Sequence, residues 1–223
     1  MKSSMLVCQI SDPHVSLPGE LSRRVVDCAA LLEQCVEAIL RLPQRPDVVV
    51  ATGDLVDSGG MEEYAHVRRL LAPLSMPIYL IPGNRDDRAA MRSAFSDHAY
   101  LHQWQPFIQY AVDDWPLRIV ALDTVVPTES GGRLCVERLD WLDRTLASKP
   151  DRPTLLIMHH PPFPTFIGST LDSGSTAAKP SPGLSRATLR SSGCCAATCI
   201  ALSPSVSPAP LLRFAPAPRT RRH

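Results

Sequence analysis

Residues 48–57 read Val48-Val49-Val50-Ala51-Thr52-Gly53-Asp54-Leu55-Val56-Asp57, and this stretch decides how the rest of the chain is organised. Its first five residues are apolar or β-branched, a pattern typical of a buried strand in a parallel sheet. Gly53-Asp54 then predicts a sharp turn, which leaves the Asp54 carboxylate at the carboxyl end of the strand. Open α/β sheets carry their chemistry at that edge, so Asp54 is the first candidate functional residue.

Three other apolar runs end in polar residues in the same way. They run from Met5 to Ile10 into Ser11-Asp12-Pro13-His14, from Pro77 to Ile81 into Pro82-Gly83-Asn84-Arg85-Asp86, and from Thr154 to Met158 into His159-His160-Pro161-Pro162. Each motif alone has an ordinary structural explanation as a loop, a helix cap, a turn or a strand end. Four of them in this order, each after an apolar strand, favour one common site.

Between these strands the spacing of apolar residues predicts helices that return along the sheet. The expected helices cover Leu21 to Leu40, Met61 to Leu71, Asp87 to Phe95 and Leu134 to Leu146. Two further strands are expected at Phe107 to Val112 and Leu117 to Leu122, around a turn at residues 113–116. The order β-α-β-α-β-α-β-β-α-β predicts an α/β fold.

Composition divides the chain near Asp172. All 22 acidic residues precede Ser173, whereas seven of the 23 basic residues follow Asp172. We therefore expect one domain at residues 1–172 and a disordered tail rich in Ser, Pro, Ala and Arg at residues 173–223. The basic run Arg219-Thr220-Arg221-Arg222 contains no aromatic residue and is a weak footprint for nucleic acid, although a tail that binds nucleic acid or a protein stays an alternative.

Other features of the chain argue for a cytoplasmic protein. No apolar run approaches the length of about 20 residues that a membrane span needs, and no signal-peptide pattern precedes the first strand. Cys8, Cys28, Cys35 and Cys135 each stand alone in an apolar pattern, which predicts buried thiols in a reducing compartment. A zinc site from Cys194, Cys195 and Cys199 is an alternative that lacks a fourth ligand with the right spacing.

The donors at the predicted sheet edge are carboxylates, imidazoles and an amide. Oxygen and imidazole ligands without thiolates suit Mn, Fe, Zn, Co or Mg. A shared carboxylate can bridge two such ions about 3.5–4 Å apart, the arrangement used for phosphoryl transfer.

With these motifs the sequence resembles the calcineurin-like metallophosphoesterases, whose pattern is D-x-H, G-D, G-N-H-D/E, a strand-end His and G-H-x-H. Within this superfamily it is similar to the bacterial class III 3′,5′-cyclic-nucleotide phosphodiesterases. That likeness rests on four segments, Pro82 to Arg88, Ala121-Leu122-Asp123-Thr124, Leu139-Asp140-Trp141-Leu142 and His159-His160-Pro161-Pro162. It implies a four-layer α/β/β/α sandwich with two mixed sheets, truncated here after the His159 strand.

The resemblance also implies residue roles. Asp12 and His14 would hold one metal, Asp54 would bridge, and Asn84 with His159 would hold a second, with His160 behind the site or facing the substrate. Asp54, Asn84 and Arg85 would be the catalytic residues, and a hydroxide supplied on the metals would attack phosphorus. The cofactors would be two ions of Fe, Mn, Zn or Co.

Two departures from the family pattern matter. Arg85 stands where the family has His, and a guanidinium can stabilise a phosphorane but cannot donate a proton near pH 7. No Gly-His-x-His follows His160. Because that motif would bring one ligand to each metal, the second metal site is expected to be impaired.

The missing motif can be encoded in another reading frame, in which the third base of each codon is read with the first two bases of the next. In that frame the codons of Ala196 to Ala201 permit Gly-His-Val-His-Arg, and TCN codons at Ser191 and Ser192 would encode apolar residues. We therefore hypothesise a frame shift between Asp172 and Gly174. The gene sequence across these codons tests it.

The functional prediction is a metal-dependent phosphodiesterase acting on a small phosphodiester, with 3′,5′-cyclic AMP or another cyclic nucleotide as the favoured substrate. Alternatives are a different phosphodiesterase or phosphomonoesterase of the superfamily, and a catalytically defective remnant that binds a single metal weakly. We expect no membrane or nucleic-acid partner, and the sequence leaves a homodimer open.

Overall fold

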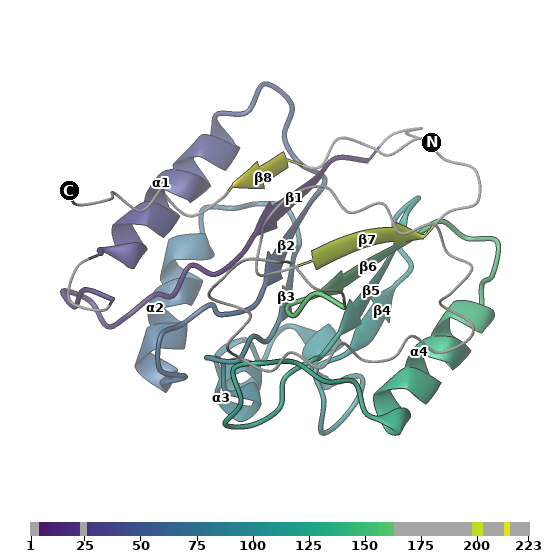
Figure 1. The fold of residues 1–223 in the computed structure, drawn as a ribbon. Coiled ribbons are helices and arrows are strands. Elements are labelled where there is room, and N and C mark those ends of the chain that lie inside the picture. Colours follow the sequence, from purple (N-terminus) through teal and green to yellow (C-terminus); the bar gives the residue numbers. More distant parts are fainter. Residues whose placement is uncertain (1–4, 23–25, 163–197, 203–211, 215–223) are drawn as a thin grey trace, which may run out of the picture.

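The computed structural model describes residues 5–22, 26–162, 198–202 and 212–214, and its strands form two sheets (Figure 1). The first sheet has the order β3-β2-β1-β8 and the second has the order β4-β5-β6-β7. The strands are β1 (Val7–Ile10), β2 (Val48–Thr52), β3 (Ile78–Ile81), β4 (Tyr110–Val112), β5 (Arg118–Leu122), β6 (Thr154–Met158), β7 (Thr198–Leu202) and β8 (Leu212–Phe214).

The first sheet is wholly parallel in the described strands, and the second is mixed. The expectation of two mixed sheets was therefore wrong for the first sheet. The reason is that β1, β2 and β3 are joined by helical crossovers, which connect parallel neighbours, whereas β4 and β5 are joined by a short connection that reverses the chain. β5 and β6 are again parallel, with α4 between them.

Helices cover the outer faces of the two sheets, which confirms the predicted α/β sandwich (Figure 1). The helices are α1 (Cys28–Leu40), α2 (Met61–Leu71), α3 (Arg88–Ala94) and α4 (Val136–Ala147), with a short 3₁₀ helix η1 (Ala99–His102). In Figure 1, α1 and α2 flank the first sheet and α4 flanks the second. α1 begins seven residues later than Leu21 because the Asp27 carboxylate caps it, accepting from Ala30 N at 2.9 Å.

The strands of the second sheet divide their side chains between two cores. Ile119, Ala121, Leu155 and Ile157 belong to the large core that also contains the first sheet and its helices. Their neighbours along the strands, among them Val120 and Leu156, pack with Leu142 of α4. This two-residue alternation is what a sheet covered on both faces requires.

Two short strands in the predicted tail differ from the expectation of an irregular segment. β7 pairs antiparallel with β6, and β8 pairs parallel with β1. Both lie at sheet edges, where unpaired N–H and C=O groups favour the addition of a strand. The rest of the tail, and with it the Cys194–Cys195 part of the alternative zinc site, lies outside the described residues.

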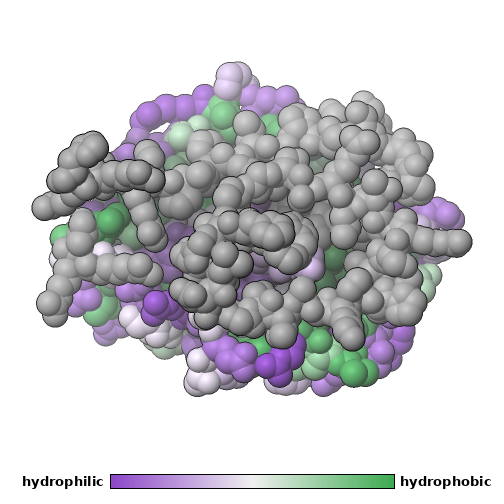
Figure 2. All heavy atoms as spheres, viewed as in Figure 1, coloured by the Kyte–Doolittle hydropathy of each residue, from purple (hydrophilic) through white to green (hydrophobic). Residues whose placement is uncertain are grey.

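The described surface exposes large hydrophobic side chains at Leu21, Val26, Met61 and Val136. In the space-filling view, green hydrophobic residues at the outline of the molecule lie among purple hydrophilic ones (Figure 2). Within the described part of the chain, no helix combines the length and the apolar character needed to cross a membrane. Cys8, Cys28, Cys35 and Cys135 are free thiols, but only Cys8 is buried as predicted, and the other three are partly exposed.

Candidate metal centre

The Asp12–His14 loop is attached to the Asp54 loop through the backbone. Asp12 N donates to Gly53 O at 3.1 Å, and His14 N donates to Asp54 O at 2.9 Å. These bonds extend the parallel pairing of β1 and β2 beyond the ends of both strands. The two loops are therefore joined along their backbones, which keeps their side chains at a common edge.

The backbone of these loops is strained at the candidate ligands themselves. Asp12, His14 and Asp54 have φ values of 55°, 45° and 51°. Non-glycine residues rarely adopt positive φ, and such conformations gather at functional sites, where the surrounding structure holds them in place. Here the strain directs three side chains toward one point.

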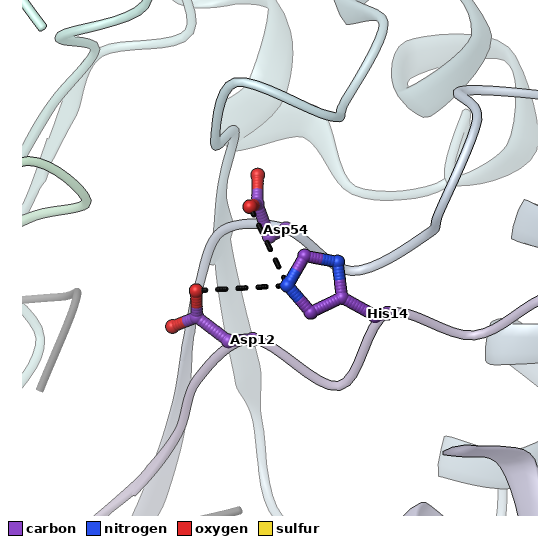
Figure 3. Close-up of side chains that lie close together, drawn as sticks. All are labelled: Asp12, His14 and Asp54. Atoms are coloured by element: carbon purple, nitrogen blue, oxygen red, sulfur yellow. Dashed lines mark ion pairs between the residues drawn. The ribbon is translucent and has the colours of Figure 1, made fainter. Parts of the chain in front are cut away.

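Asp12, His14 and Asp54 form a compact group whose ligand atoms all lie within 4.8 Å of one another (Figure 3). His14 Nε2 is 3.9 Å from Asp12 Oδ1 and 3.6 Å from Asp54 Oδ2. The imidazole thus points its Nε2 between two carboxylates that come from different loops.

His159 approaches the other oxygen of Asp54. Its Nδ1 lies 2.9 Å from Thr52 O, and because a carbonyl only accepts, Nδ1 carries the proton. In this tautomer the lone pair is on Nε2, which lies 3.6 Å from Asp54 Oδ1. Backbone carbonyls fix metal-binding histidines in this way, and the arrangement leaves Asp54 with one imidazole at each oxygen.

The loop after β3, residues 82–87, packs tightly on Asp54. A Cβ on Gly83 would lie 2.3 Å from Asp54 Oδ1, so this position has no room for a side chain. Arg85 N donates to the same oxygen at 2.8 Å. Asn84 lies between these two residues at the sheet edge, half-buried, and the Arg85 side chain is exposed.

Sequence reasoning did not assign a role to Asp86, which lies beneath this loop. Its carboxylate accepts from Gly83 N at 2.8 Å, from Leu55 N at 3.2 Å and from Tyr64 Oη at 2.9 Å. Burial raises the pKa of Asp86 to about 7, although the bond from Gly83 N acts in the opposite direction. The only signal in the sequence was its place two residues after Asn84.

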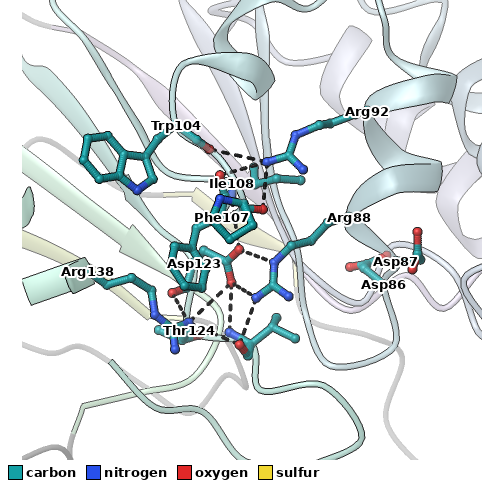
Figure 4. Close-up of polar contacts among 12 residues, drawn as sticks. Asp86, Asp87, Arg88, Arg92, Trp104, Phe107, Ile108, Asp123, Thr124 and Arg138 are labelled. Carbon is teal, nitrogen blue, oxygen red and sulfur yellow. Dashed lines mark hydrogen bonds and ion pairs between the residues drawn. The ribbon is translucent and has the colours of Figure 1, made fainter. Parts of the chain in front are cut away.

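A second carboxylate at the end of a strand, Asp123, was also missed as a structural centre. It follows β5, is fully buried, and accepts from Arg88 Nε at 2.6 Å and Arg88 Nη2 at 2.8 Å. Arg138 Nη1 lies 3.8 Å from it, and Phe107 lies beside both guanidinium groups (Figure 4). This cluster joins α3, the β5 loop and α4.

His160 belongs to the loops around this second cluster. Its Nδ1 is 2.7 Å from Thr124 Oγ1, and its ring meets the His159 ring edge-on with the centroids 4.7 Å apart. A Cβ on Gly132 would lie 2.4 Å from the His160 ring, so a close approach of the backbone covers it. Burial lowers the pKa of His160 to about 4, which keeps the ring neutral at pH 7.

The donor set of the candidate centre fits a divalent metal. Burial raises the pKa of Asp12, and none of the lysines and arginines in the described ranges forms an ion pair with Asp12 or Asp54. Two carboxylates and two imidazoles without a lysine or arginine partner are a donor set that can accept a cation. Oxygen and nitrogen donors are those that Mn, Fe, Zn and Co accept.

A cavity of about 530 Å³ lies at the opposite end of β3 and is separate from these ligands. It is bordered by Ile78, Tyr79 and Tyr100 and by the turn after β4. The candidate centre is recognised instead by its converging ligands, which stand on the carboxyl ends of β1, β2 and β6.

Comparison with known proteins places this geometry in a family. Residues 5–186 match the calcineurin-like phosphoesterase family. The chain is 34% identical to the glycerophosphodiester phosphodiesterase GpdQ of Enterobacter lignolyticus, over 72% of this chain and 58% of that protein. It is 35% identical to the 3′,5′-cyclic adenosine monophosphate phosphodiesterase CpdA of Pseudomonas aeruginosa, over 75% of this chain and 58% of that protein.

A third relative is the 3′,5′-cyclic adenosine monophosphate phosphodiesterase CpdA of Escherichia coli strain K12, 33% identical over 71% of this chain and 56% of that protein. The matched part of the chain thus spans less than two thirds of the length of these relatives. The match to the family covers most of the chain and includes Asp12, His14, Asp54 and His159. The resemblance inferred from the motifs is confirmed, and the chain belongs to the calcineurin-like phosphoesterase family.

Proposed function

We propose that this protein is a metal-dependent phosphodiesterase that hydrolyses a small phosphodiester, with a 3′,5′-cyclic nucleotide as its substrate class. The observation that carries the proposal is the position of Asp54, with His14 Nε2 3.6 Å from one oxygen and His159 Nε2 3.6 Å from the other. Two relatives named as cyclic adenosine monophosphate phosphodiesterases support the choice of substrate, and the GpdQ relative makes a glycerophosphodiester the next substrate to test.

The residues would divide the work as follows. Asp12 and His14 would hold one ion with Asp54, and His159 and Asn84 would hold the other. When bound, such ions polarise phosphoryl oxygens and lower the pKa of water. Asp54 would contribute one oxygen to each position, and the bond to Thr52 O directs the other ring nitrogen of His159, Nε2, at the centre.

Arg85 would act as a charge partner for the phosphate. Its backbone is attached to Asp54 and its side chain is exposed at the edge of the centre. A guanidinium stabilises negative charge on phosphate oxygens but does not release a proton near pH 7. Esters with a good leaving group should therefore be hydrolysed more readily than natural substrates.

The test is an assay of the purified chain with Mn²⁺ on 3′,5′-cyclic AMP, a glycerophosphodiester and bis(p-nitrophenyl) phosphate. Turnover of cyclic AMP to AMP that is lost in Asp54→Asn supports the proposal. A folded chain that binds Mn²⁺ and turns over none of the three substrates contradicts it.

A second candidate is a defective family member that binds one ion without turnover. Two observations favour it. Asp12, His14 and Asp54 alone make the compact ligand group of the described residues, and the sequence has no Gly-His-x-His after His160. Mn²⁺ titration distinguishes the two, because binding of one ion per chain without turnover supports the second candidate.

A further inference from the structure

We infer that Tyr64 and Asp86 form a positioning pair that holds the loops carrying Asp54 and Asn84 against each other. The inference rests on the proposed function in one respect, the assignment of Asp54 and Asn84 as metal ligands. Neither Tyr64 nor Asp86 reaches the centre, and both would act through the loops that carry those ligands.

The loops after β2 and β3 exchange hydrogen bonds in both directions. The Asp54 carboxylate, on the β2 loop, accepts from Arg85 N of the β3 loop at 2.8 Å. The Asp86 carboxylate, on the β3 loop, accepts from Leu55 N of the β2 loop at 3.2 Å. Each bond involves a residue directly adjacent to a proposed ligand, so a shift of one loop moves the other.

Asp86 also fixes the shape of its own loop. Its Oδ2 accepts from Gly83 N at 2.8 Å, which closes the turn around Asn84. Gly83 has no room for a side chain, because a Cβ there would lie 2.4 Å from Asp54 N. The turn that presents Asn84 is thus held against the Asp54 backbone from below by one carboxylate.

Tyr64 anchors this carboxylate to the body of the fold. Tyr64 belongs to α2, and its side chain is fully buried. Its hydroxyl donates to Asp86 Oδ1 at 2.9 Å and accepts from Asp87 N at 2.9 Å. α2 is packed in the large core, so the hydroxyl is a fixed point. Carboxylates and hydroxyls in such positions orient metal ligands, and their loss typically weakens metal binding about 10- to 100-fold.

The chain offers a matched control for Tyr64. Tyr110, on β4, is also fully buried, and its hydroxyl donates to Leu80 O at 2.8 Å. Tyr64→Phe and Tyr110→Phe each remove one buried hydroxyl that binds the backbone near β3. Only the first removes a contact of the loops that carry the proposed ligands.

The first experiment measures hydrogen exchange of the Arg85 amide in the metal-free chain by NMR. Tyr64→Phe should accelerate this exchange about ten-fold relative to wild type, because loosening Asp86 loosens the reciprocal bond to Asp54. Tyr110→Phe should lower the melting temperature of the chain without accelerating hydrogen exchange at Arg85. Equal exchange rates at Arg85 in both variants would overturn the inference.

The second experiment titrates Co²⁺ and records its d–d absorption, which reports ligand geometry. Tyr64→Phe should bind Co²⁺ about ten-fold more weakly with altered bands, and Asp86→Asn more weakly still, whereas Tyr110→Phe should match wild type. If Tyr64→Phe binds Co²⁺ with wild-type affinity and unchanged absorption bands, the inference is also overturned. A wild-type chain that binds no Co²⁺ contradicts the proposed function, and the exchange rates then decide the inference alone.

Discussion

Two carboxylates at the same edge of the sandwich, Asp123 and Asp54, have very different charge partners. Asp123 is fully buried and is met by Arg88 at 2.6 Å and 2.8 Å, with Arg138 at 3.8 Å. Asp54 is 5% exposed and is faced by His14 and His159 at 3.6 Å. Both follow apolar strands, yet the protein supplies the positive charge for only one of them.

The difference separates a structural cluster from a functional one. A buried carboxylate between guanidinium groups has its charge compensated within the chain, and removal of either partner leaves an unpaired buried charge. A carboxylate between imidazoles, with Asp12 close by, is poorly compensated until a cation binds. The first cluster should therefore stabilise the fold under all conditions, and the second should do so only with metal.

The largest effect is expected for Asp123→Asn. Loss of this carboxylate leaves the buried Arg138 and the partly buried Arg88 without their charge partner, and breaking a buried pair typically costs about 3–5 kcal/mol of unfolding free energy. Urea denaturation of the metal-free chain measures the loss. A cost below about 1 kcal/mol would show that Asp123 is not the structural centre of its cluster.

The opposite response is expected for Asp12→Asn. Removing one of two neighbouring carboxylates relieves repulsion, so the metal-free variant should be as stable as wild type or more so. Mn²⁺ at 100 times its dissociation constant should stabilise wild type by about 2.7 kcal/mol and should leave the variant unchanged.

Thermal melts with Mn²⁺ and with EDTA measure both effects. Asp151→Asn, which alters an exposed carboxyl before β6, serves as the control and should keep the wild-type response to Mn²⁺. A metal-free Asp12→Asn variant that melts well below wild type would place Asp12 with the structural residues.

These two clusters also show how far the sequence could predict the site. Apolar runs that end in Asp or His indicated which residues meet at the sheet edge, because the carboxyl ends of parallel strands lie together. The same pattern applies equally to Asp123, so a strand-end position does not distinguish a ligand from an ion-pair partner. That distinction depends on Arg88 and Arg138, which only the tertiary fold brings to Asp123.

For the fold, too, the sequence predicted the main elements but not every boundary. Strand positions followed from β-branched runs, and the sandwich followed from the family motifs. The start of α1 was misplaced because Ser22 and Val26 pair with each other before Asp27 caps the helix. The proton on His159 Nδ1 also required the structure, since Thr52 lies more than 100 residues away in the chain.

A smaller effect is expected for Thr124→Val, which lies between the two clusters. Thr124 is 3% exposed, and its Oγ1 binds His160 Nδ1 at 2.7 Å. Loss of this hydrogen bond should cost about 1 kcal/mol of unfolding free energy while the response to Mn²⁺ stays at the wild-type level. Urea denaturation and Mn²⁺ melts test both parts.

Thr154→Val is the matched control for that variant. Thr154 is also 3% exposed, but its hydroxyl binds Arg152 O at the far end of β6. It should cost a similar free energy. A Mn²⁺ response that falls in Thr124→Val and not in Thr154→Val would show that the two clusters are energetically coupled through His160.

The smallest effect is expected for Asp97→Asn. This variant removes an ion pair with the same two-bond geometry as the Arg88–Asp123 pair, but at an exposed position. Arg68 binds Asp97 with two hydrogen bonds of 2.6 Å and 2.8 Å, as Arg88 binds Asp123, but these side chains are 45% and 57% exposed. Water and salt screen such a pair, so its loss should cost well under 1 kcal/mol. The hydrogen bond from Arg68 lowers the pKa of Asp97, so its small contribution is present above the usual carboxyl pKa of 3.8 and is lost as the pH falls below it. Urea denaturation at pH 7 in low and high salt measures the contribution, which should shrink in high salt.

A cost close to that of Asp123→Asn would contradict this prediction. It would mean that the pair of hydrogen bonds, rather than burial, determines how much an ion pair stabilises the fold. The contrast between Asp123 and Asp54 would then need a different explanation.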